Sequence, residues 1–419
     1  RWLDWMEEVL EQAEHLQREA FARWDDHDWR TVVASAPRLI EVLRQTVYLD
    51  ALRESNPTEY QAALHMMRLL DRVEYAALVR ATRTVSILGE ASTMRRMAAD
   101  LSAATVDDSL AVPGVTGGLL AVRETAKGLL VVGGPGENRY EVAARLILDV
   151  GGNDTYVNGG ARVGYELDEE GRLLSSIRVV LDLAGDDRYE ARDFLGLGAA
   201  VGGIALHADL AGNDHYVARG RGALGFAMFG VGLFVDHAGN DSYAADSFSL
   251  GAAMGGIGLF LDRAGDDRTT AATHAVGLGL PMGIGAWVDA AGNDHVVARG
   301  DQGQPPVPST YGTAGAYNGF VFGCGMGLRG IPRAGNPSFS GGGIGLASSG
   351  GGDDRYEAGE FAFGIGYFLG LGIFHDASGN DSYRASRYGL ATGAHQAFGV
   401  FLDDSGDDDY QALGEAASL

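Results

Sequence analysis

The first hundred residues carry apolar side chains at the three- and four-residue spacing of amphipathic helices. Leu3, Met6, Leu10 and Ala13 follow this spacing near the start of the chain. Asn56-Pro57 predicts a second helix start, because asparagine caps free N–H groups and proline fits the first helical position. We therefore expect residues 1–105 to form an α-helical capping domain that covers an open end of the following structure.

Beyond residue 140 the pattern changes to short apolar runs that each end in an Asp-x-x-Gly turn. Residues 257–261 and 371–375 are two such runs, and short apolar runs bounded by turns are typical of strands. Variants of the phrase Asp-x-x-Gly-(Asn/Asp)-Asp-x-Tyr occur nine times up to Asp408, mostly 27 residues apart. A fixed period of this size indicates one unit stacked many times.

The period predicts a mainly β protein, a Gly-rich β-solenoid of about ten ~27-residue coils. The expected solenoid covers residues 141–419, and residues 106–140 are the expected junction to the helical domain. An insertion at about residues 300–316 interrupts the repeat, and it is equally compatible with a functional loop and with a neutral addition. The coil after it has Pro332 and Pro337 in place of both aspartates, so we expect no metal at that turn.

Composition narrows the choice of partners. The formal charge of −24 argues against nucleic acid and anionic membranes, and it fits metal cations. The longest apolar stretches are too short and too rich in glycine to span a bilayer. The chain starts at Arg1 without a methionine, so we expect that an upstream segment, such as a signal peptide, has been removed. These features predict a secreted, periplasmic or cell-surface protein of unknown oligomeric state.

Paired aspartates open and close the repeated turns. Equivalent residues of stacked coils lie ~4.8 Å apart, so two columns of carboxylates would repel each other along the stack. Ca²⁺ is a natural remedy, because it accepts six to eight oxygen ligands. The alternative is that each aspartate accepts hydrogen bonds from N–H groups of its own turn. The predicted ligands are Asp182, Asp187, Asp209, Asp214, Asp236, Asp241, Asp262, Asp267, Asp289, Asp294, Asp376, Asp381, Asp403 and Asp408.

Two of the turns resemble a known calcium-binding repeat. Gly151-Gly-Asn-Asp-Thr-Tyr156 and Gly351-Gly-Asp-Asp-Arg-Tyr356 are similar to the latter part of the nonapeptide of RTX toxins and secreted proteases. The resemblance covers about six residues per coil, and the nine- or eighteen-residue period of that family is absent. It implies a similar turn and calcium, not a similar overall roll. The tyrosine that ends each phrase fits a half-buried cap.

One further row suggests catalysis. Ser247, His274 and Asp301 are each 27 residues apart, in the order nucleophile, base and orienting carboxylate. If these residues share one row on three consecutive coils, the imidazole could activate the serine. The alternative is an ordinary set of polar residues at a coil corner. Cys324, the only cysteine, falls in a mostly apolar column and is expected to be a buried small hydrophobe instead of a nucleophile.

Three functions follow from these patterns. The first is a calcium-stabilised extracellular scaffold or binding module, which repetition alone would explain. The second is a hydrolase that uses the Ser247, His274 and Asp301 row on an extended polymer or peptide along the solenoid edge. The third is a polysaccharide lyase or glycoside hydrolase with Arg329 or Arg333 as the base, by analogy with other β-solenoids.

Overall fold

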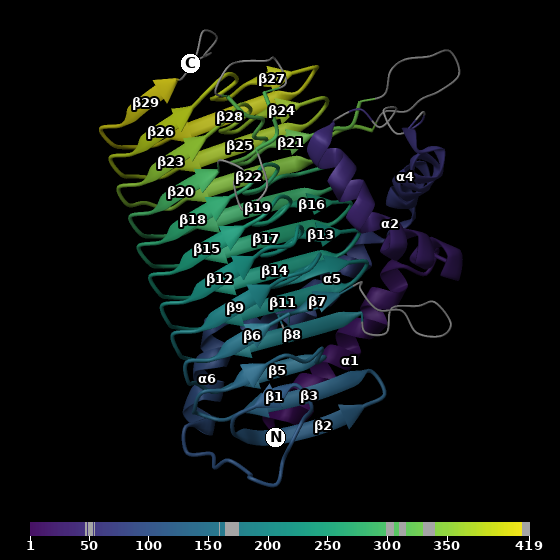
Figure 1. Ribbon diagram of the computed structural model, residues 1–419, viewed down its shortest axis with the longest axis vertical. Helices are drawn as coiled ribbons and strands as arrows, with labels where there is room; N and C mark the ends of the chain where they lie inside the picture. The colour runs from purple at the N-terminus through teal and green to yellow at the C-terminus, as the bar shows by residue number, and fades with distance from the viewer. Residues whose placement is uncertain are drawn as a thin grey trace.

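The protein is a tall parallel β-solenoid with a group of helices against its side (Figure 1). This computed structural model describes residues 1–46, 48, 53, 55–158, 160–163, 176–298, 306–309, 316–329 and 340–412. The expectation of a mainly β, Gly-rich solenoid with an N-terminal helical region is confirmed.

Each regular coil contributes one strand to each of three sheets, which we name A, B and C. Sheet A contains, in spatial order, β2 (Leu119–Thr125), β3 (Gly128–Gly133), β5 (Leu146–Asp149), β8 (Ile177–Asp182), β11 (Ile204–Asp209), β14 (Val231–Asp236), β17 (Ile257–Asp262), β19 (Ile284–Asp289), β22 (Ile344–Ser349), β25 (Leu371–Asp376) and β28 (Phe398–Asp403). The Asp-rich turn connects each strand of sheet A to the next strand of sheet B.

Sheet B is the second long sheet, and sheet C is a set of short strands in two parts. Sheet B contains β1 (Val115–Thr116), β4 (Arg139–Tyr140), β6 (Thr155–Val157), β9 (Arg188–Ala191), β12 (His215–Ala218), β15 (Ser242–Ala245), β18 (Arg268–Ala271), β20 (His295–Ala298), β23 (Arg355–Ala358), β26 (Ser382–Ala385) and β29 (Asp409–Ala412). Sheet C contains β7 (Arg162–Val163), β10 (Ala199–Val201), β13 (Ala227–Met228) and β16 (Ala253–Met254), then β21 (Gly325–Met326), β24 (Gly366–Tyr367) and β27 (Gly393–Ala394).

The predicted register of the coils is confirmed. Asp209 pairs with Asp236, Asp236 with Asp262, and Asp262 with Asp289, all as direct neighbours on parallel strands. About eight turns of ~27 residues follow this register, and two irregular coils precede them: Leu130 pairs with Leu146, and Leu146 pairs with Val179. The first of these two coils already begins at β3, within residues 106–140.

The insertion does not form a coil of its own. β19 pairs directly with β22 and β20 pairs with β23, although the closing aspartates Asp294 and Asp354 are 60 residues apart. The expectation of a separate, irregular coil between these two turns is therefore wrong. β21 instead supplies the sheet C strand of this coil and pairs with β24. Residues 331–337, with the two prolines, lie outside the described residues.

The helices are α1 (Trp2–Ala20), α2 (Asp26–Gln45), α4 (Pro57–Leu69), α5 (Tyr75–Ser86) and α6 (Ala91–Leu101), with 3₁₀ turns η1 (Leu70–Arg72) and η2 (Ile87–Gly89). The predicted helix start is confirmed, because the Asn56 side chain accepts a hydrogen bond from the backbone N–H of Glu59 at 3.2 Å. Met6, Leu10 and Ala13 of α1 are fully buried, as their helical spacing predicts.

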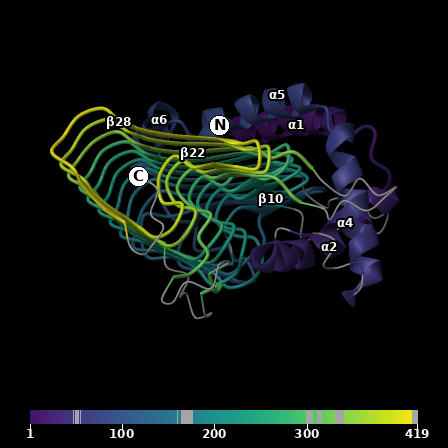
Figure 2. The ribbon, with the colours of Figure 1, turned by 90° about the horizontal axis from the view of Figure 1, so that it is seen from above.

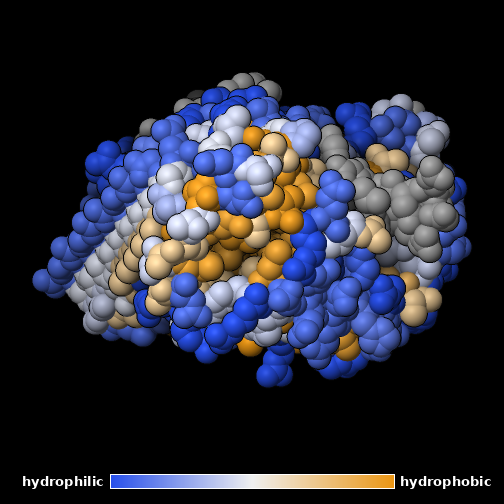
Figure 3. Space-filling model, turned by 90° about the horizontal axis from the view of Figure 1, so that it is seen from below, coloured by the Kyte–Doolittle hydropathy of each residue, from blue (hydrophilic) through white to orange (hydrophobic). Residues whose placement is uncertain are grey.

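The helices cover the side of the solenoid and not its end. Apolar residues of α1, α2 and α5 form one core with outward side chains of sheet A in the first coils, for example Leu206. In the view from above, α1 and α5 lie along one face of the stack (Figure 2). The N-terminal end is instead closed by β1, which pairs antiparallel with β4, and by the antiparallel β2–β3 hairpin, whose β3 pairs parallel with β5. Seen from below, apolar side chains gather at this end inside a hydrophilic border (Figure 3).

A second core fills the inside of the coils. It combines small aliphatic residues with stacked aromatic side chains, among them Tyr216, Phe234, Tyr243 and Phe260. Backbones approach closely at the Asp-rich turns: a Cβ at Gly212 would lie 1.6 Å from the carbonyl oxygen of Gly185 in the preceding coil. Only glycine fits there, so the repeated glycine sets the close stacking of the turns that carry the aspartates.

Candidate metal centre

The opening aspartates form one buried column at the ends of the strands of sheet A. Each folds back on its own turn, as the Asx-turn alternative predicts: the backbone N–H of Ala211 donates to Oδ1 of Asp209 at 3.0 Å, and that of Ala238 donates to Oδ1 of Asp236 at 3.1 Å. Asp209 and Asp236 are both 0% exposed. The turn hydrogen bonds fix the direction in which the second carboxylate oxygen points.

The closing aspartates form a second column that links consecutive coils. The backbone N–H of Asp214 donates to Oδ1 of Asp241 at 2.6 Å, and the backbone N–H of Asp241 donates to Oδ1 of Asp267, also at 2.6 Å. The same hydrogen bond joins Asp294 to Asp354 across the insertion, at 2.8 Å. Each closing carboxylate therefore has one oxygen committed to the neighbouring backbone.

The remaining oxygen of several closing aspartates has no hydrogen-bond partner. It is Oδ2 of Asp154, Asp187, Asp267, Asp294 and Asp381, each of which is at most 3% exposed. An unpaired carboxylate oxygen in the interior is costly, because the lost hydration is not replaced. These oxygens need a partner that the side chains around them do not supply.

The two columns together form a repeated cluster of three carboxylates. Each cluster contains the opening and closing aspartates of one coil and the opening aspartate of the next, with one oxygen from each within 4.8 Å of the others. Five of the clusters are Asp149/Asp154/Asp182, Asp182/Asp187/Asp209, Asp209/Asp214/Asp236, Asp236/Asp241/Asp262 and Asp262/Asp267/Asp289. Consecutive clusters share an opening aspartate, so each further cluster requires only two additional carboxylates.

Without a cation, this crowding favours the protonated form of the aspartates. Burial, together with Asp236, raises the pKa of Asp214 to about 9, and burial, together with Asp262, raises that of Asp267 to about 9. Burial raises the pKa of Asp241 and of Asp294 to about 7. The columns therefore take up either protons or cations at neutral pH.

One coil provides a natural comparison. Ser349 replaces the opening aspartate, and its hydroxyl donates to Oδ2 of Asp354 at 2.8 Å. Asp354 is therefore satisfied by a neutral partner in the coil where one carboxylate is missing. At Asp262 and Asp267, where both aspartates are present, the closing Oδ2 lacks a hydrogen bond, whereas Oδ2 of Asp214 and Oδ2 of Asp241 each accept a long hydrogen bond of 3.4 Å from a tyrosine hydroxyl. The serine therefore supplies a donor that an opening aspartate cannot supply in its ionised form.

A ladder of tyrosines borders the aspartate columns. Tyr189, Tyr216 and Tyr243 stack with ring centroids 4.7 and 5.0 Å apart and are at most 2% exposed, so the expectation of half-buried caps is wrong for them. Each hydroxyl donates to the opening aspartate of the next coil, as from Tyr189 to Asp209 at 2.6 Å. The ladder is interrupted where Thr269 and Val296 replace tyrosine in the stack.

The clusters offer only oxygen ligands. Carboxylates and phenol hydroxyls suit hard cations such as Ca²⁺, Mg²⁺ or Mn²⁺, whereas zinc sites in proteins usually include histidine or cysteine. Asp149 and Asp154 belong to the first cluster but were missed as ligands, although Asp149-Val-Gly-Gly-Asn-Asp154 is a variant of the repeated phrase. The tyrosine hydroxyls were also missed, since their acceptor lies in the next coil.

The expected row of Ser247 and His274 is not formed. Phe248, and not Ser247, stacks on the His274 ring at 5.2 Å, and the backbone N–H of Phe248 donates to the His274 carbonyl at 2.8 Å. The coil from Asp241 to Asp267 has 26 residues, which shifts Ser247 out of line with His274. Both residues are 1% exposed, and Asp301 lies outside the described residues. Catalysis by these residues stays a prediction.

The cysteine and arginine candidates for catalysis come next. Cys324 is fully buried in the apolar core, as expected, and burial raises the pKa of its thiol. Arg329 donates to the Tyr48 hydroxyl at 3.1 Å and lies over the Tyr48 ring, while Arg333 is outside the described residues.

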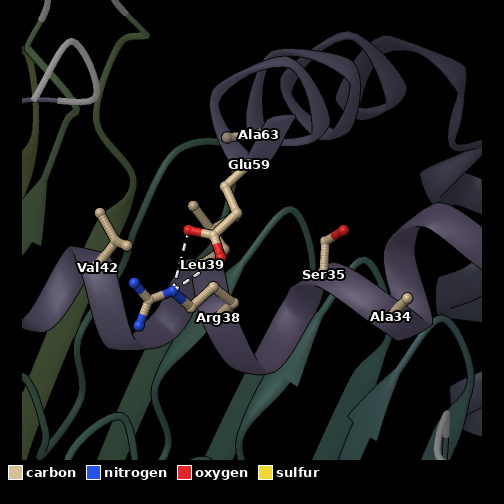
Figure 4. A pocket seen from close by; sticks show the side chains of 7 residues that line it. All are labelled: Ala34, Ser35, Arg38, Leu39, Val42, Glu59 and Ala63. Carbon is tan, nitrogen blue, oxygen red and sulfur yellow. Dashed lines mark hydrogen bonds and ion pairs between the residues drawn. The ribbon is translucent and has the colours of Figure 1, made fainter. Parts of the chain in front are cut away.

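A cavity of about 100 Å³ lies between α2 and α4, where Arg38 pairs with Glu59 at 3.0 Å (Figure 4).

A scan against protein-family models, a search of curated proteins and a search of solved structures each found no match. Among the described residues, no helix is both long enough and apolar enough to cross a membrane.

Proposed function

We propose that this protein is a calcium-stabilised extracellular β-solenoid that acts as a scaffold or binding module. The observation that carries the proposal is the repeated cluster of three buried carboxylates, in several of which the closing aspartate keeps an unpaired Oδ2. A ligand that fills these clusters would stabilise the stack along most of its length.

Charge balance supports a divalent cation. Each coil adds one opening and one closing aspartate, so one divalent ion per coil neutralises both carboxylates. One proton per coil would leave a negative charge in every coil, repeated at strand spacing of ~4.8 Å. Calcium tolerates irregular, carboxylate-rich coordination better than magnesium, which requires a near-ideal octahedron. The resemblance of the turns to RTX repeats points to the same ion.

The burial of the clusters supports a structural role. Asp209, Asp236 and Asp262 are 0% exposed and lie under stacked tyrosines, so a substrate would not reach them. Weak calcium sites of extracellular modules bind at ~10⁻⁴–10⁻³ M, which suits an ion that is present at high concentration outside cells. The metal would hold coils together while the outer faces remain available for binding.

Thermal unfolding with and without calcium tests the proposal. Millimolar Ca²⁺ is about 1–10 times a Kd of ~10⁻⁴–10⁻³ M, which adds about 0.4–1.4 kcal/mol per site, so several sites together should raise Tm by on the order of 5 °C relative to EGTA. Elemental analysis of dialysed protein should then find several calcium ions per chain. Equal Tm values in Ca²⁺ and EGTA, with no bound metal, would overturn the calcium proposal and leave protons as the partners of the carboxylates.

A spectroscopic measurement locates the ion. Terbium binds at the oxygen-ligated sites that calcium occupies, and it emits light when a nearby phenol ring transfers excitation energy to it. The tyrosine hydroxyls contact the aspartates of the clusters, for example Tyr216 and Asp236 at 2.6 Å, so bound terbium should emit on tyrosine excitation. Excess Ca²⁺ should abolish this emission. Emission that Ca²⁺ does not displace would place terbium outside the clusters.

A further inference from the structure

Sheet A is covered by helices in its first coils and bare in its last coils. The outward first residues of β8, β11 and β14, which are Ile177, Ile204 and Val231, are all 0% exposed. The corresponding residues of β19 and β22, Ile284 and Ile344, are 44% and 41% exposed. The cover therefore ends near β17, whose Ile257 and Leu259 still touch the helical core.

The bare part of this sheet remains apolar. The outward side chains are the first, third and fifth residues of β19, β22, β25 and β28, and we call them the bare face. All are apolar except Ser348 and His375, and Phe398 is 74% exposed. Sheet B is different in the same coils, where polar residues, among them His295, Arg355 and Ser382, stack on the outside. Sheet B therefore does not share the apolar exterior of sheet A.

We propose that the bare face binds a second copy of this chain, so that the protein is a two-fold symmetric dimer. Four strands at ~4.8 Å spacing and six residues at ~3.3 Å give a flat area of roughly 400 Å² per copy. Because the side chains project from the sheet, two copies would bury on the order of 1,000 Å², the lower limit for a specific interface. Patches of this size on a soluble protein mark interaction sites.

The shape of the molecule selects one arrangement. The helical layer rises about one helix diameter, ~10 Å, above sheet A, and face-to-face sheets pack ~10 Å apart. If the two stacks ran in the same direction, the helical layers would meet first and hold the bare faces apart. With the stacks antiparallel, the two bare faces meet, and α1 and α5 of one copy lie beside the last coil of its partner.

A second copy fits this face better than a single helix. The strands of the bare face are about 20 Å long, whereas a helix is 10–12 Å across and would cover about half of that length. A partner sheet of the same width covers all of it, with strands aligned as in a β-sandwich. The small area and the net charge of −24 on each copy predict a reversible dimer, with a Kd in the micromolar range.

Sedimentation velocity of the full chain between 1 and 100 μM tests the proposal. The expected result is a concentration-dependent rise from 44.0 kDa to twice that mass, in Ca²⁺ and in EGTA, because the bare face does not involve the aspartate columns. Ile344→Lys should raise the dimer Kd at least tenfold, and its exposed position allows the monomer to fold. Val297→Lys, at an outward site of sheet B beside Glu357, is the matched control and should dimerise like the wild type.

Two outcomes would overturn the proposal. A monomer at 100 μM would exclude the second copy and leave the bare face to an amphipathic helix of another protein. A dimer that Ile344→Lys does not weaken, while Val297→Lys does, would place the interface on sheet B. A chain that dimerises but shows no calcium response would support this inference while contradicting the proposed function.

Discussion

The hydroxyl of Tyr216 donates a 2.6 Å hydrogen bond to Oδ2 of Asp236, which belongs to the next coil. The same relationship joins Tyr156 to Asp182 at 2.5 Å and Tyr243 to Asp262 at 2.5 Å. Each tyrosine thus ties its own coil to the carboxylate cluster of its neighbour. The ring stack and the metal-binding candidate form one connected structure, and its parts can be tested separately.

Removal of one hydroxyl from this ladder should destabilise the fold without disrupting the ring stack. Tyr216→Phe leaves Oδ2 of Asp236 without its donor in a fully buried position. We expect a loss of about 1–3 kcal/mol in the free energy of unfolding, measured by urea denaturation. Tyr410→Phe is the control, because Tyr410 is 39% exposed and water can replace its hydroxyl. Equal losses for both variants would contradict this account.

Loss of one carboxylate should reduce the rise in Tm caused by Ca²⁺ more than it reduces the stability of the metal-free fold. Asp241→Asn removes one charge from the Asp236/Asp241/Asp262 cluster, so the difference between Tm in Ca²⁺ and in EGTA should shrink. Asp266→Asn is the matched control: Asp266 is exposed in the turn before Asp267, where several other coils have asparagine. The control should keep the full calcium response. A calcium response unchanged in Asp241→Asn would argue against an ion in this cluster.

The metal-free protein should lose stability as the pH rises. The folded-state pKa values of Asp241, Asp294 and Asp214, about 7, 7 and 9, exceed the ordinary value of 3.8. Because the folded state binds these protons more tightly, their stabilising contribution is complete below pH ~4 and is lost as the pH rises through 7 to 9. In EGTA, Tm should fall between pH 5 and pH 9. Millimolar Ca²⁺ should reduce this fall, since the ion replaces the protons.

Close stacking of the turns should not tolerate a methyl group. A Cβ at Gly212 would lie 1.6 Å from the Gly185 carbonyl oxygen, whereas a Cβ at Gly136 has no atom within 4 Å. Gly212→Ala should therefore cost at least about 3 kcal/mol, the upper part of the range for overpacking. Gly136→Ala should change the free energy of unfolding by less than about 0.5 kcal/mol. Chemical denaturation of both variants distinguishes backbone contact from a general effect of glycine replacement.

A fluorophosphonate probe tests the serine hydrolase hypothesis. Since Ser247 is 1% exposed and Phe248 occupies the place beside His274, we expect no labelling of Ser247. Mass spectrometry of the probed protein gives the answer. Labelling of Ser247 that disappears in His274→Ala would restore the catalytic interpretation.

The sequence determined the repeat, the strand before each turn and the two aspartate columns. The phrase around Asp209, Asp236 and Asp262 marks the same turn in every coil, and strands of equal length between turns can pair in only one register. The sequence also predicted the buried helix face of Met6 and Leu10 and the cap at Asn56, because these features depend on neighbours within a few residues.

The tertiary structure decided what depends on contacts between distant segments. Counting from Asp267 could not show that a coil one residue shorter places Phe248, and not Ser247, beside His274. The direct pairing of β19 with β22 across the insertion could not be predicted either, since an inserted segment does not change the sequence pattern of the strands on either side of it. The helices cover the side of sheet A because its outward residues Ile204 and Val231 are apolar, and burial there removes that surface from water. Local patterns fix the turns and the strands; the partners of buried oxygens and of apolar faces are fixed only when the coils stack.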